Sequence, residues 1–498
     1  MQSKLEVLKQ IKIGERIAED EAEDLMKYFV ETDQWRKIRS GEIDIVYGPK
    51  GSGKSAIYTL LIKQESALFD TNILIVPAEN VRGATVFQSI MSDPLPSEIN
   101  FIYLWKIYSL VLIAKKLKEF GIFNGKAQPL IRALEEAKLL PASGSLSAMF
   151  RAVTNYVKAW TQRDVKASEI ALTIDSQTGT PTFSKRTEFG EISEEQSLRK
   201  IPVDELLDIA GEALEKANIN VWLLFDRLDV AFADSKDLEK NALRALFRVY
   251  NDLKAYPAIG MKIFVRDDIW RRIAFGGFTE ASHITKSVHI DWNEEDLLNL
   301  IVLRLLNNAA FVEYAKVDIK HVKANYKSKS DLFYKIVPDQ VDTGKNPSTL
   351  NWMISRTTDA SGNSVPREII HLLEETKKVQ ISKFERGDME PTDQQLFERI
   401  AFKEALPIVS KVRFEQTLLA EYPDMLDALQ KLEGEKAEQT IKSLSHLWEI
   451  TPEETLKTVK RLSEIGFFET RGTRDAPAYW VPFIYRNALK LIQGKAED

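Results

Sequence analysis

The chain has 498 residues, enough for roughly two to four domains, and is 44% hydrophobic and 29% charged, which is ordinary for a globular protein. Its formal net charge of -6 argues against a wholly basic protein that coats nucleic acid, although it leaves room for a local basic patch. The absence of cysteine excludes disulfides, thiolate metal sites and a cysteine nucleophile, and it suits a reducing cytoplasm, where we expect the protein to be.

Neither the first residues nor the most apolar run is expected to enter a membrane. Residues 1–25 mix charged and apolar side chains without an uncharged core, unlike a signal peptide. The apolar run from Phe101 ends at Ala114 and is interrupted by Lys106, so it is too short and too charged to span a bilayer. We therefore expect no membrane contact and predict a buried helix at this run.

The first part of the chain is predicted to lead from helix into strand. Residues 5–40 carry apolar side chains at every third or fourth position, which is typical of a helix. Residues 42–48 alternate between apolar and polar side chains and predict a strand that runs directly into a glycine-rich stretch, with a helix after it. Residues 72–79 predict a second apolar strand.

The next part is predicted to be an insertion into the sheet domain. Residues 93–168 read as mostly helical and are long for a crossover between strands. Residues 173–186 carry turn signals between short β-prone runs, which indicates a surface hairpin. We therefore assign residues 93–200 to a mostly helical inserted subdomain.

Strands and helices alternate again from residue 202. The continuous apolar run Val221–Phe225 is typical of a central parallel strand buried on both faces. Further strands are predicted from Met261 and at residues 287–292, and a helix follows each of them. The predicted fold class is therefore α/β, with a doubly wound parallel sheet of the P-loop NTPase type at residues 41–306.

The predicted domains follow from this pattern. An N-terminal helical segment occupies residues 1–40, before the sheet domain. Residues 307–404 form a helical lid, in which residues 385–393 are a polar linker candidate, and residues 405–498 form a winged-helix domain.

One loop in the sequence has a composition suited to phosphate. Gly48 to Ser55 matches G-x-x-x-x-G-K-[ST], whose glycines let backbone N–H groups turn onto phosphates, while a chance glycine-rich turn is the alternative. Lys54 would reach the β and γ phosphates, and the Ser55 hydroxyl would hold Mg²⁺. The predicted nucleotide-binding residues are Gly48, Pro49, Lys50, Gly51, Ser52, Gly53, Lys54, Ser55, Ala56 and Arg367.

Two carboxylates follow the predicted strand at Val221–Phe225. Asp226 closes that strand and would hold Mg²⁺ through water, with Ser55 as the other predicted metal residue. Asp229 comes three residues later and would orient or deprotonate the attacking water; a helix N-cap or an ion pair is its alternative role. The five histidines show no spacing typical of a metal site.

Hydrolysis also needs a cation near the γ-phosphate. Arg266 ends the next predicted strand at the same sheet edge, so we predict a catalytic phosphate sensor there, alongside Lys54; a self-contained salt-bridge turn is the alternative. Arg367 follows Pro366 at a helix start in the lid and would report the nucleotide state, if it is more than a surface residue. Arg271 and Arg272 are candidates for action on a neighbouring subunit.

The last residues predict two helices followed by a hairpin. Thr451 and Pro452 are typical of an N-cap and the first helical position, and Gly466 is expected to end that helix. Its apolar face is predicted to consist of Leu456, Val459, Leu462 and Ile465. The candidates to face DNA are Lys457, Lys460, Arg461, Arg471 and Arg474. A protein contact or lid role is almost as strongly favoured, because acids lie at the end of the helix that usually meets base edges.

These motifs together resemble P-loop ATPases of the AAA/STAND superclass. The segments GPKGSGKS and LLFDRLD, with IFVRDDIW and the PRE helix behind them, carry the resemblance, which covers residues from about 36 to 490. The order of core, lid and winged helix is similar to origin-recognition-type ATPases, and the F-D-R-L-D segment resembles bacterial P-loop ATPases. Arg227 departs from the AAA pattern, which has Glu there, and an acid at Asp229 resembles the NACHT type.

The resemblance favours an ATPase that acts as a slow molecular switch over one with the fast turnover of a motor protein. It implies a slow Mg²⁺-dependent ATPase that controls its assembly, as a homo-oligomer or with a partner protein, in a role such as bacterial anti-phage defence. The alternative is a DNA-binding ATPase for replication or transposition loading, and a third reading is an ATP-stabilised scaffold without turnover.

Overall fold

The computed structural model describes residues 3–15, 21, 23–81, 85–88, 97–140, 144–164, 172–174, 181–183, 203–228, 235–275, 282–473 and 476–496. Its centre is a five-stranded sheet in the order β2-β5-β6-β1-β7, in which every neighbouring pair is parallel. The strands are β1 (Ile45–Gly48), β2 (Ile73–Pro77), β5 (Asn220–Phe225), β6 (Ile259–Arg266) and β7 (Ser287–His289). The predicted parallel α/β sheet is thus confirmed.

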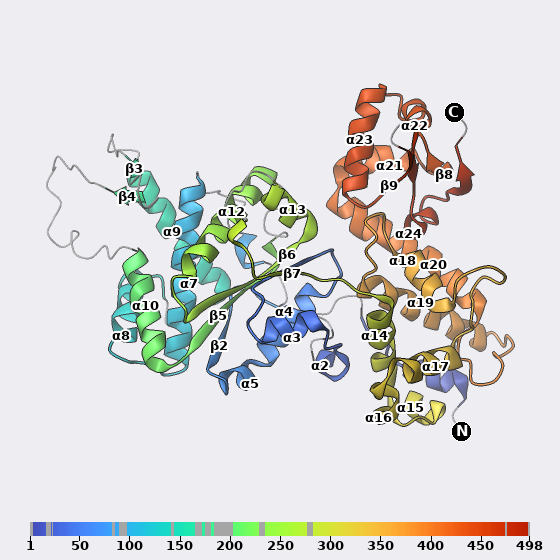
Figure 1. The fold of residues 1–498 in the computed structure, drawn as a ribbon, viewed down its shortest axis with the longest axis horizontal. Coiled ribbons are helices and arrows are strands. Elements are labelled where there is room, and N and C mark those ends of the chain that lie inside the picture. Colours follow the sequence, from blue (N-terminus) through green and yellow to red (C-terminus); the bar gives the residue numbers. More distant parts are fainter. Residues whose placement is uncertain are drawn as a thin grey trace.

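Alternate residues of the strands face two separate cores, so helices cover both faces of the sheet (Figure 1). Leu223 and Phe225 of β5 face the larger core, while Leu224 between them faces the smaller one. The smaller core is closed by α2 (Leu25–Tyr28), α3 (Asp33–Arg39), α4 (Lys54–Lys63) and α5 (Glu65–Phe69). This alternation follows from the two-residue period of a strand.

The larger core contains the helices of the predicted insertion. These helices and the flanking elements are η1 (Val86–Gln88), α7 (Glu98–Glu119), α8 (Ala127–Glu136), α9 (Leu146–Asp164), α10 (Val203–Ala217), α12 (Lys236–Leu253) and α13 (Asp267–Phe275). The predicted hairpin is confirmed as β3 (Leu172–Ile174) paired antiparallel with β4 (Pro181–Phe183). The apolar run at Phe101 lies in α7, and Trp105 and Tyr108 there are fully buried, as predicted for a core helix.

Within the described part of the chain, no single helix is long and apolar enough to cross a membrane, and a bent pair of helices passes only when taken together.

The N-terminal segment is not the continuous helix predicted for residues 5–40. It forms α1 (Lys4–Gln10) and the short helices α2 and α3, while Ile11–Ile13 and Phe29–Val30 are not helical. Gly14 has φ +125°, outside the helical range, and Thr32 caps a new helix by accepting a hydrogen bond from the Trp35 N–H. The apolar spacing therefore predicts correctly that apolar residues of this segment are buried, but it is wrong in predicting one continuous helix.

The remaining helices and the C-terminal elements share a third core, which also includes Val7 and Leu8 of α1. The elements after the sheet are α14 (Glu294–Leu306), α15 (Ala309–Ala315), α16 (Ile319–Ala324), α17 (Tyr326–Ile336), α18 (Thr349–Thr357), α19 (Pro366–Glu385), α20 (Arg399–Arg413), the π-helix η4 (Phe414–Leu419), η5 (Pro423–Met425) and α21 (Leu426–Gln430). Figure 1 shows this half on the right, with the N-terminus beside α15 and α17.

The last elements form a helix pair with a small sheet. They are β8 (Lys436–Gln439), α22 (Ile441–Trp448), α23 (Pro452–Glu464), β9 (Glu469–Thr473), β10 (Ala476–Trp480), α24 (Phe483–Arg486) and β11 (Ile492–Lys495), and the sheet order is β11-β8-β10-β9. Thr451 caps α23 with Pro452 after it, and Gly466 has φ +81°, as predicted. The prediction that Leu456 faces the core is wrong, because Leu456 is 55% exposed and Thr455 is buried in its place.

Candidate functional site

The glycine-rich loop connects β1 to α4 and has the backbone shape that a phosphate loop requires. Gly51 and Gly53 have φ values of +87° and +101°, which L side chains rarely adopt. A Cβ added at Gly51 would lie 2.9 Å from Cβ of Arg367, so α19 leaves no space for a side chain there. The loop therefore depends on glycine both for its conformation and for its contact with α19.

The lysine and the serine that end the motif lie where the loop turns into the helix. Lys54 Nζ donates hydrogen bonds of 2.8 Å to the carbonyl oxygens of Gly48 and Pro49, which places its ammonium group within the curve of the loop. Ser55 is in the first turn of α4, and the carbonyl of Ser52 accepts a 2.8 Å bond from Trp292 Nε1. The N-terminus of α4 thus lies beside a lysine ammonium group, an arrangement suited to an anion.

Asp226 follows β5 directly and lines the same cavity as Lys54 and Ser55. Its side chain is buried, with 4% exposed. Arg227 after it has φ +56°, so the chain turns sharply at the position where the resemblance would place a glutamate. Asp229, the predicted water-orienting carboxylate, lies outside the described residues.

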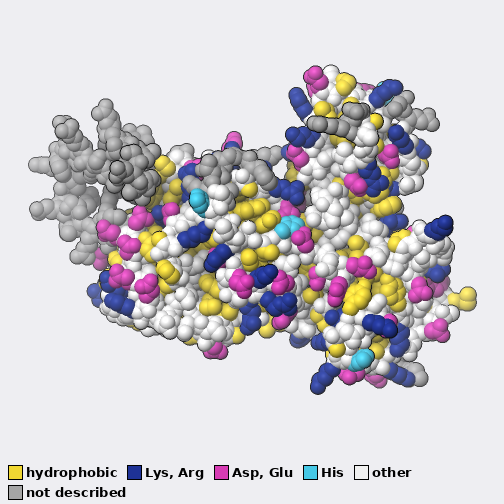
Figure 2. Space-filling model, viewed as in Figure 1, with side chains coloured by type: hydrophobic (Ala, Val, Ile, Leu, Met, Phe, Trp, Pro, Cys, Tyr) yellow, Lys and Arg dark blue, Asp and Glu magenta, His cyan; other side chains and the backbone are white. Residues whose placement is uncertain are grey.

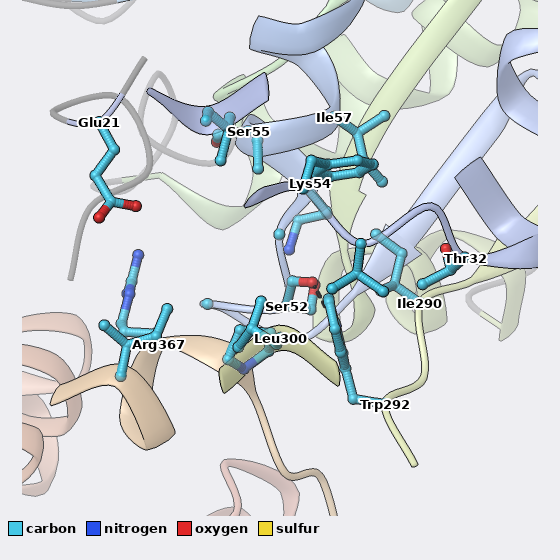
Figure 3. Close-up of a pocket in the computed structure, with 18 of the residues that line it drawn as sticks. Glu21, Thr32, Ser52, Lys54, Ser55, Ile57, Ile290, Trp292, Leu300 and Arg367 are labelled. Atoms are coloured by element: carbon cyan, nitrogen blue, oxygen red, sulfur yellow. Dashed lines mark hydrogen bonds between the residues drawn. The ribbon is translucent and has the colours of Figure 1, made fainter. Parts of the chain in front are cut away.

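The cavity has a volume of about 240 Å³ and extends from the loop to an apolar wall (Figure 3). That wall consists of residues that our sequence reasoning missed, namely Tyr28, Phe29, Val30, Ile57, Ile290, Trp292, Leu300 and Ile370. They come from the N-terminal segment, α4, the chain after β7, α14 and α19, and no motif marks them. A flat apolar base would be enclosed by such a wall while its phosphates reach the loop.

A buried ion pair fixes the N-terminal segment over this cavity. Arg304 of α14 binds Glu21 through two nitrogens, at 2.9 and 2.8 Å, and both side chains are 5% exposed. Arg304 Nη1 also donates to the Ile13 carbonyl, and its guanidinium lies 4.4 Å from the centre of the Tyr28 ring. Burial raises the pKa of Tyr28, so this tyrosine stays neutral in the wall.

Arg266 lies at the sheet edge beside the loop, as predicted. Its Cα pairs with that of Gly48 across β1 and β6, and it lines the cavity. The salt-bridge turn that was the alternative also exists, since Arg266 Nε donates to Asp268 Oδ1 at 2.9 Å. Arg266 Nη2 additionally contacts Glu421 Oε2 at 2.9 Å, a partner that the sequence does not suggest.

Arg367 lies in the first turn of α19, behind Pro366, as predicted. It lines the cavity, and Figure 3 shows its side chain extending from the lid toward Glu21. Arg271 is exposed on α13, whereas Arg272 is held by Glu239 at 2.7 Å. Arg367 of α19 therefore lines the same cavity as Lys54.

The C-terminal candidates for DNA contact divide into exposed and paired side chains. Lys457 and Lys460 are exposed on α23. Arg461 is bound by Asp424 at 2.7 Å, and Arg471 is bound by Glu469 at 2.9 Å and lies 3.8 Å from the centre of the Trp480 ring. Arg474 lies outside the described residues. Figure 2 shows the basic side chains of this part interspersed with acidic ones, without one large basic face on the visible side.

No family model matches the chain, and no curated protein sequence matches it. Among solved structures, it is similar to the Aeropyrum pernix ORC1 protein in complex with DNA, at 11% identity and TM-score 0.37, over 98% of each chain. It is also similar to the Aeropyrum pernix ORC2 protein in its ADPNP–ADP complexes, at 11% identity and TM-score 0.36, over 96% of this chain and 93% of that one. Similarity at this level assigns no function, so the site itself must carry the proposal.

Proposed function

We propose that the chain is a slow, Mg²⁺-dependent ATPase whose nucleotide state switches its assembly or its contacts with a partner. The observation that carries this proposal is that residues 50–55 of the phosphate loop, Asp226 and an apolar wall line one cavity. Lys54 and the backbone of Gly51 and Gly53 suit the phosphates, and Tyr28 and Trp292 suit the base.

The residues present fit a magnesium ion held between protein and phosphates. Ser55 and Asp226 supply a hydroxyl and a carboxylate, the oxygen ligands that Mg²⁺ prefers, directly or through water. When bound, Mg²⁺ neutralises charge on the phosphates. Among the described residues no group of three His, Asp or Glu side chains could hold a metal by itself.

Slow turnover is proposed because the position after Asp226 carries Arg227 in place of a carboxylate. Without a general base there, the water must be oriented from elsewhere, and Asp229 stays the candidate for that role. Arg266 and Arg367 are proposed to sense the γ-phosphate from the sheet edge and from the lid.

The test of the nucleotide site is the variant Lys54→Ala. Mg-ATP binding, measured by calorimetry, should be lost, because Lys54 is the motif lysine that would contact the β and γ phosphates. Lys63→Ala, which removes an exposed lysine at the other end of α4, is the matched control and should bind like the wild type. Wild-type affinity in Lys54→Ala would overturn the site assignment.

The switch itself is tested by particle mass with and without a non-hydrolysable ATP analogue. We expect the mass of the wild type to change with the analogue, and the mass of Lys54→Ala to stay the same. An unchanged wild-type mass would exclude nucleotide-driven self-assembly and leave a partner protein as the object of the switch. A role in anti-phage defence stays a prediction that rests on the resemblance alone.

The second candidate function, DNA binding, is favoured by one observation: α23 exposes Lys457, Lys460 and the apolar Leu456 together. The test is duplex DNA affinity across a salt series, since each phosphate contact adds to the slope. Lys457→Glu/Lys460→Glu should abolish binding, while Lys320→Glu/Lys323→Glu, with the same spacing on α16, should not. No binding by the wild type at low salt would exclude this function.

A further inference from the structure

One carboxylate of the C-terminal half joins two cations of the proposed nucleotide site. Glu421, just after η4, contacts Arg266 Nη2 through Oε2 at 2.9 Å and Lys50 Nζ through Oε1. The side chains of Glu421 and Arg266 are 16% and 17% exposed, so the contact between them is largely shielded from solvent, whereas the Lys50 side chain is 37% exposed. Shielding strengthens the interaction relative to a surface pair.

The bridge lies at the border between two cavities. Lys50 and Arg266 line the nucleotide cavity, and both also line a second cavity of about 80 Å³ together with Glu421. A carboxylate on these two cations therefore supplies negative charge at the edge of the cavity where phosphates would bind. A triphosphate would compete with Glu421 for the same two positive groups, because each cation gains from only a limited number of close anions.

The residues after Glu421 connect this bridge to α23. Arg266 Nη2 donates to the Tyr422 hydroxyl at 3.1 Å. Asp424, two residues later, accepts hydrogen bonds of 3.1 and 2.7 Å from Arg461 on α23. Residues 421–424 thus contact Lys50 and Arg266 at one end and Arg461 of α23 at the other. They follow the π-helix η4, and π-helical turns are frequent at functional sites.

We propose that Glu421 is an intramolecular latch that the terminal phosphoryl group of ATP displaces from Lys50 and Arg266, which loosens residues 421–424 from the loop and alters how α23 is held. This inference rests on the proposed nucleotide site. It goes beyond that site because it names the group that couples it to the C-terminal elements.

The coupling is reciprocal, as linkage requires. If ATP weakens the hold of Glu421, then loss of Glu421 must strengthen ATP binding. ADP lacks the competing phosphoryl group, so its affinity should depend less on Glu421. The difference between the two nucleotides is therefore the signature of the latch.

The first experiment compares Glu421→Gln with Glu415→Gln, which removes the same charge from an exposed position on η4. Glu421→Gln should bind a non-hydrolysable ATP analogue at least about fivefold more tightly than the wild type, with a smaller change for ADP. Glu415→Gln should bind both nucleotides like the wild type. Equal affinities in the two variants, with both folded by circular dichroism, would overturn the latch.

The second experiment follows amide hydrogen exchange in the wild-type chain. The ATP analogue should increase exchange at residues 421–424 and in α23, while ADP should not. Unchanged exchange in both segments would contradict the latch even if the variant fails to fold.

The two proposals fail separately. Loss of analogue binding in Lys54→Ala, together with unaltered affinity in Glu421→Gln, would keep the nucleotide site and remove the latch. Absence of analogue binding in the wild type would remove both.

Discussion

Gly48 and Arg266 are direct partners across the sheet, paired in register at the ends of β1 and β6. This pairing sets the separation of the two Cα atoms through the sheet register, while Asp268, Tyr422 and Glu421 hold the guanidinium group of Arg266. The backbone of Arg266 is therefore in place beside the loop before any nucleotide binds, and a cation held there would stabilise developing charge on a phosphoryl group.

Replacement of Arg266 by alanine should therefore slow hydrolysis more than it weakens binding. We expect the turnover number to fall on the order of 10²-fold, because a preorganised cation beside the γ-phosphate is lost. Steady-state ATPase assays at saturating ATP measure this. Arg132→Ala on α8 removes an exposed arginine and should turn over like the wild type; an equally active Arg266→Ala would assign the sensor role elsewhere.

A methyl group at Gly51 should damage both the fold and the site. Gly51→Ala combines a φ of +87° with a contact of 2.9 Å to Cβ of Arg367, so we expect a loss of about 1–3 kcal/mol in the free energy of unfolding. Urea denaturation measures the loss. Gly121 has a φ of +68° but no atom near the position of an added Cβ, so Gly121→Ala measures backbone strain alone. Gly125 has neither a positive φ nor a close neighbour, so Gly125→Ala is the unstrained control. A Gly51→Ala variant as stable as Gly125→Ala would show that the loop and lid separate easily.

The buried pair of Arg304 and Glu21 should behave differently from surface pairs. Arg304→Met leaves a buried carboxylate unpaired and should cost about 3–5 kcal/mol of stability. The double variant with Glu21→Gln should cost less than the sum of the single ones. Lys118→Met breaks an exposed pair with Glu135 and should cost about 1 kcal/mol or less. Additive losses in the double-mutant cycle would mean that the pair does not act as a unit.

His289 should make stability depend on pH near neutrality. A hydrogen bond to Asp267, at 2.9 Å from His289 Nε2, raises the pKa of this histidine above its ordinary value, with Asp291 contributing from the other nitrogen. Because the folded pKa is the higher one, the stabilisation is fully present below about pH 6.5 and is lost as pH rises through the folded pKa.

The free energy of unfolding, measured by urea denaturation across this pH range, should fall in the wild type as pH rises. His289→Gln should flatten that component, whereas His283→Gln at an exposed position should keep it. An unchanged pH profile in His289→Gln would show that the dependence arises from another group.

The parts of the site that were predictable from sequence are those encoded within a few residues. The phosphate loop is a continuous motif, and Asp226 ends an apolar strand that can be recognised by itself. The apolar wall was not predictable, because Tyr28 and Trp292 meet only through the fold and apolar side chains occur throughout the chain.

Long-range ion pairs escaped the sequence for the same reason. Glu21 and Arg304 are 283 positions apart, and nothing in the neighbouring sequence distinguishes Glu421 from nearby acids such as Glu415. For Leu456 the sequence predicts a buried position that the structure does not have. Helical spacing places Leu456 on the apolar face, but α23 packs so that Thr455 is buried and Leu456 is exposed. Periodicity identifies an amphipathic helix without specifying the rotation at which it docks.

The N-terminal segment crosses from one half of the molecule to the other. Val7 and Leu8 belong to the core shared by the helices after β7 and the C-terminal elements, whereas Trp35 and Ile38 belong to the smaller core on one face of the sheet. The halves are consequently tethered here as well as where β7 leads into α14. Because two covalent connections join the halves, we expect the cavity between them to open less widely than it would if a single connection joined them.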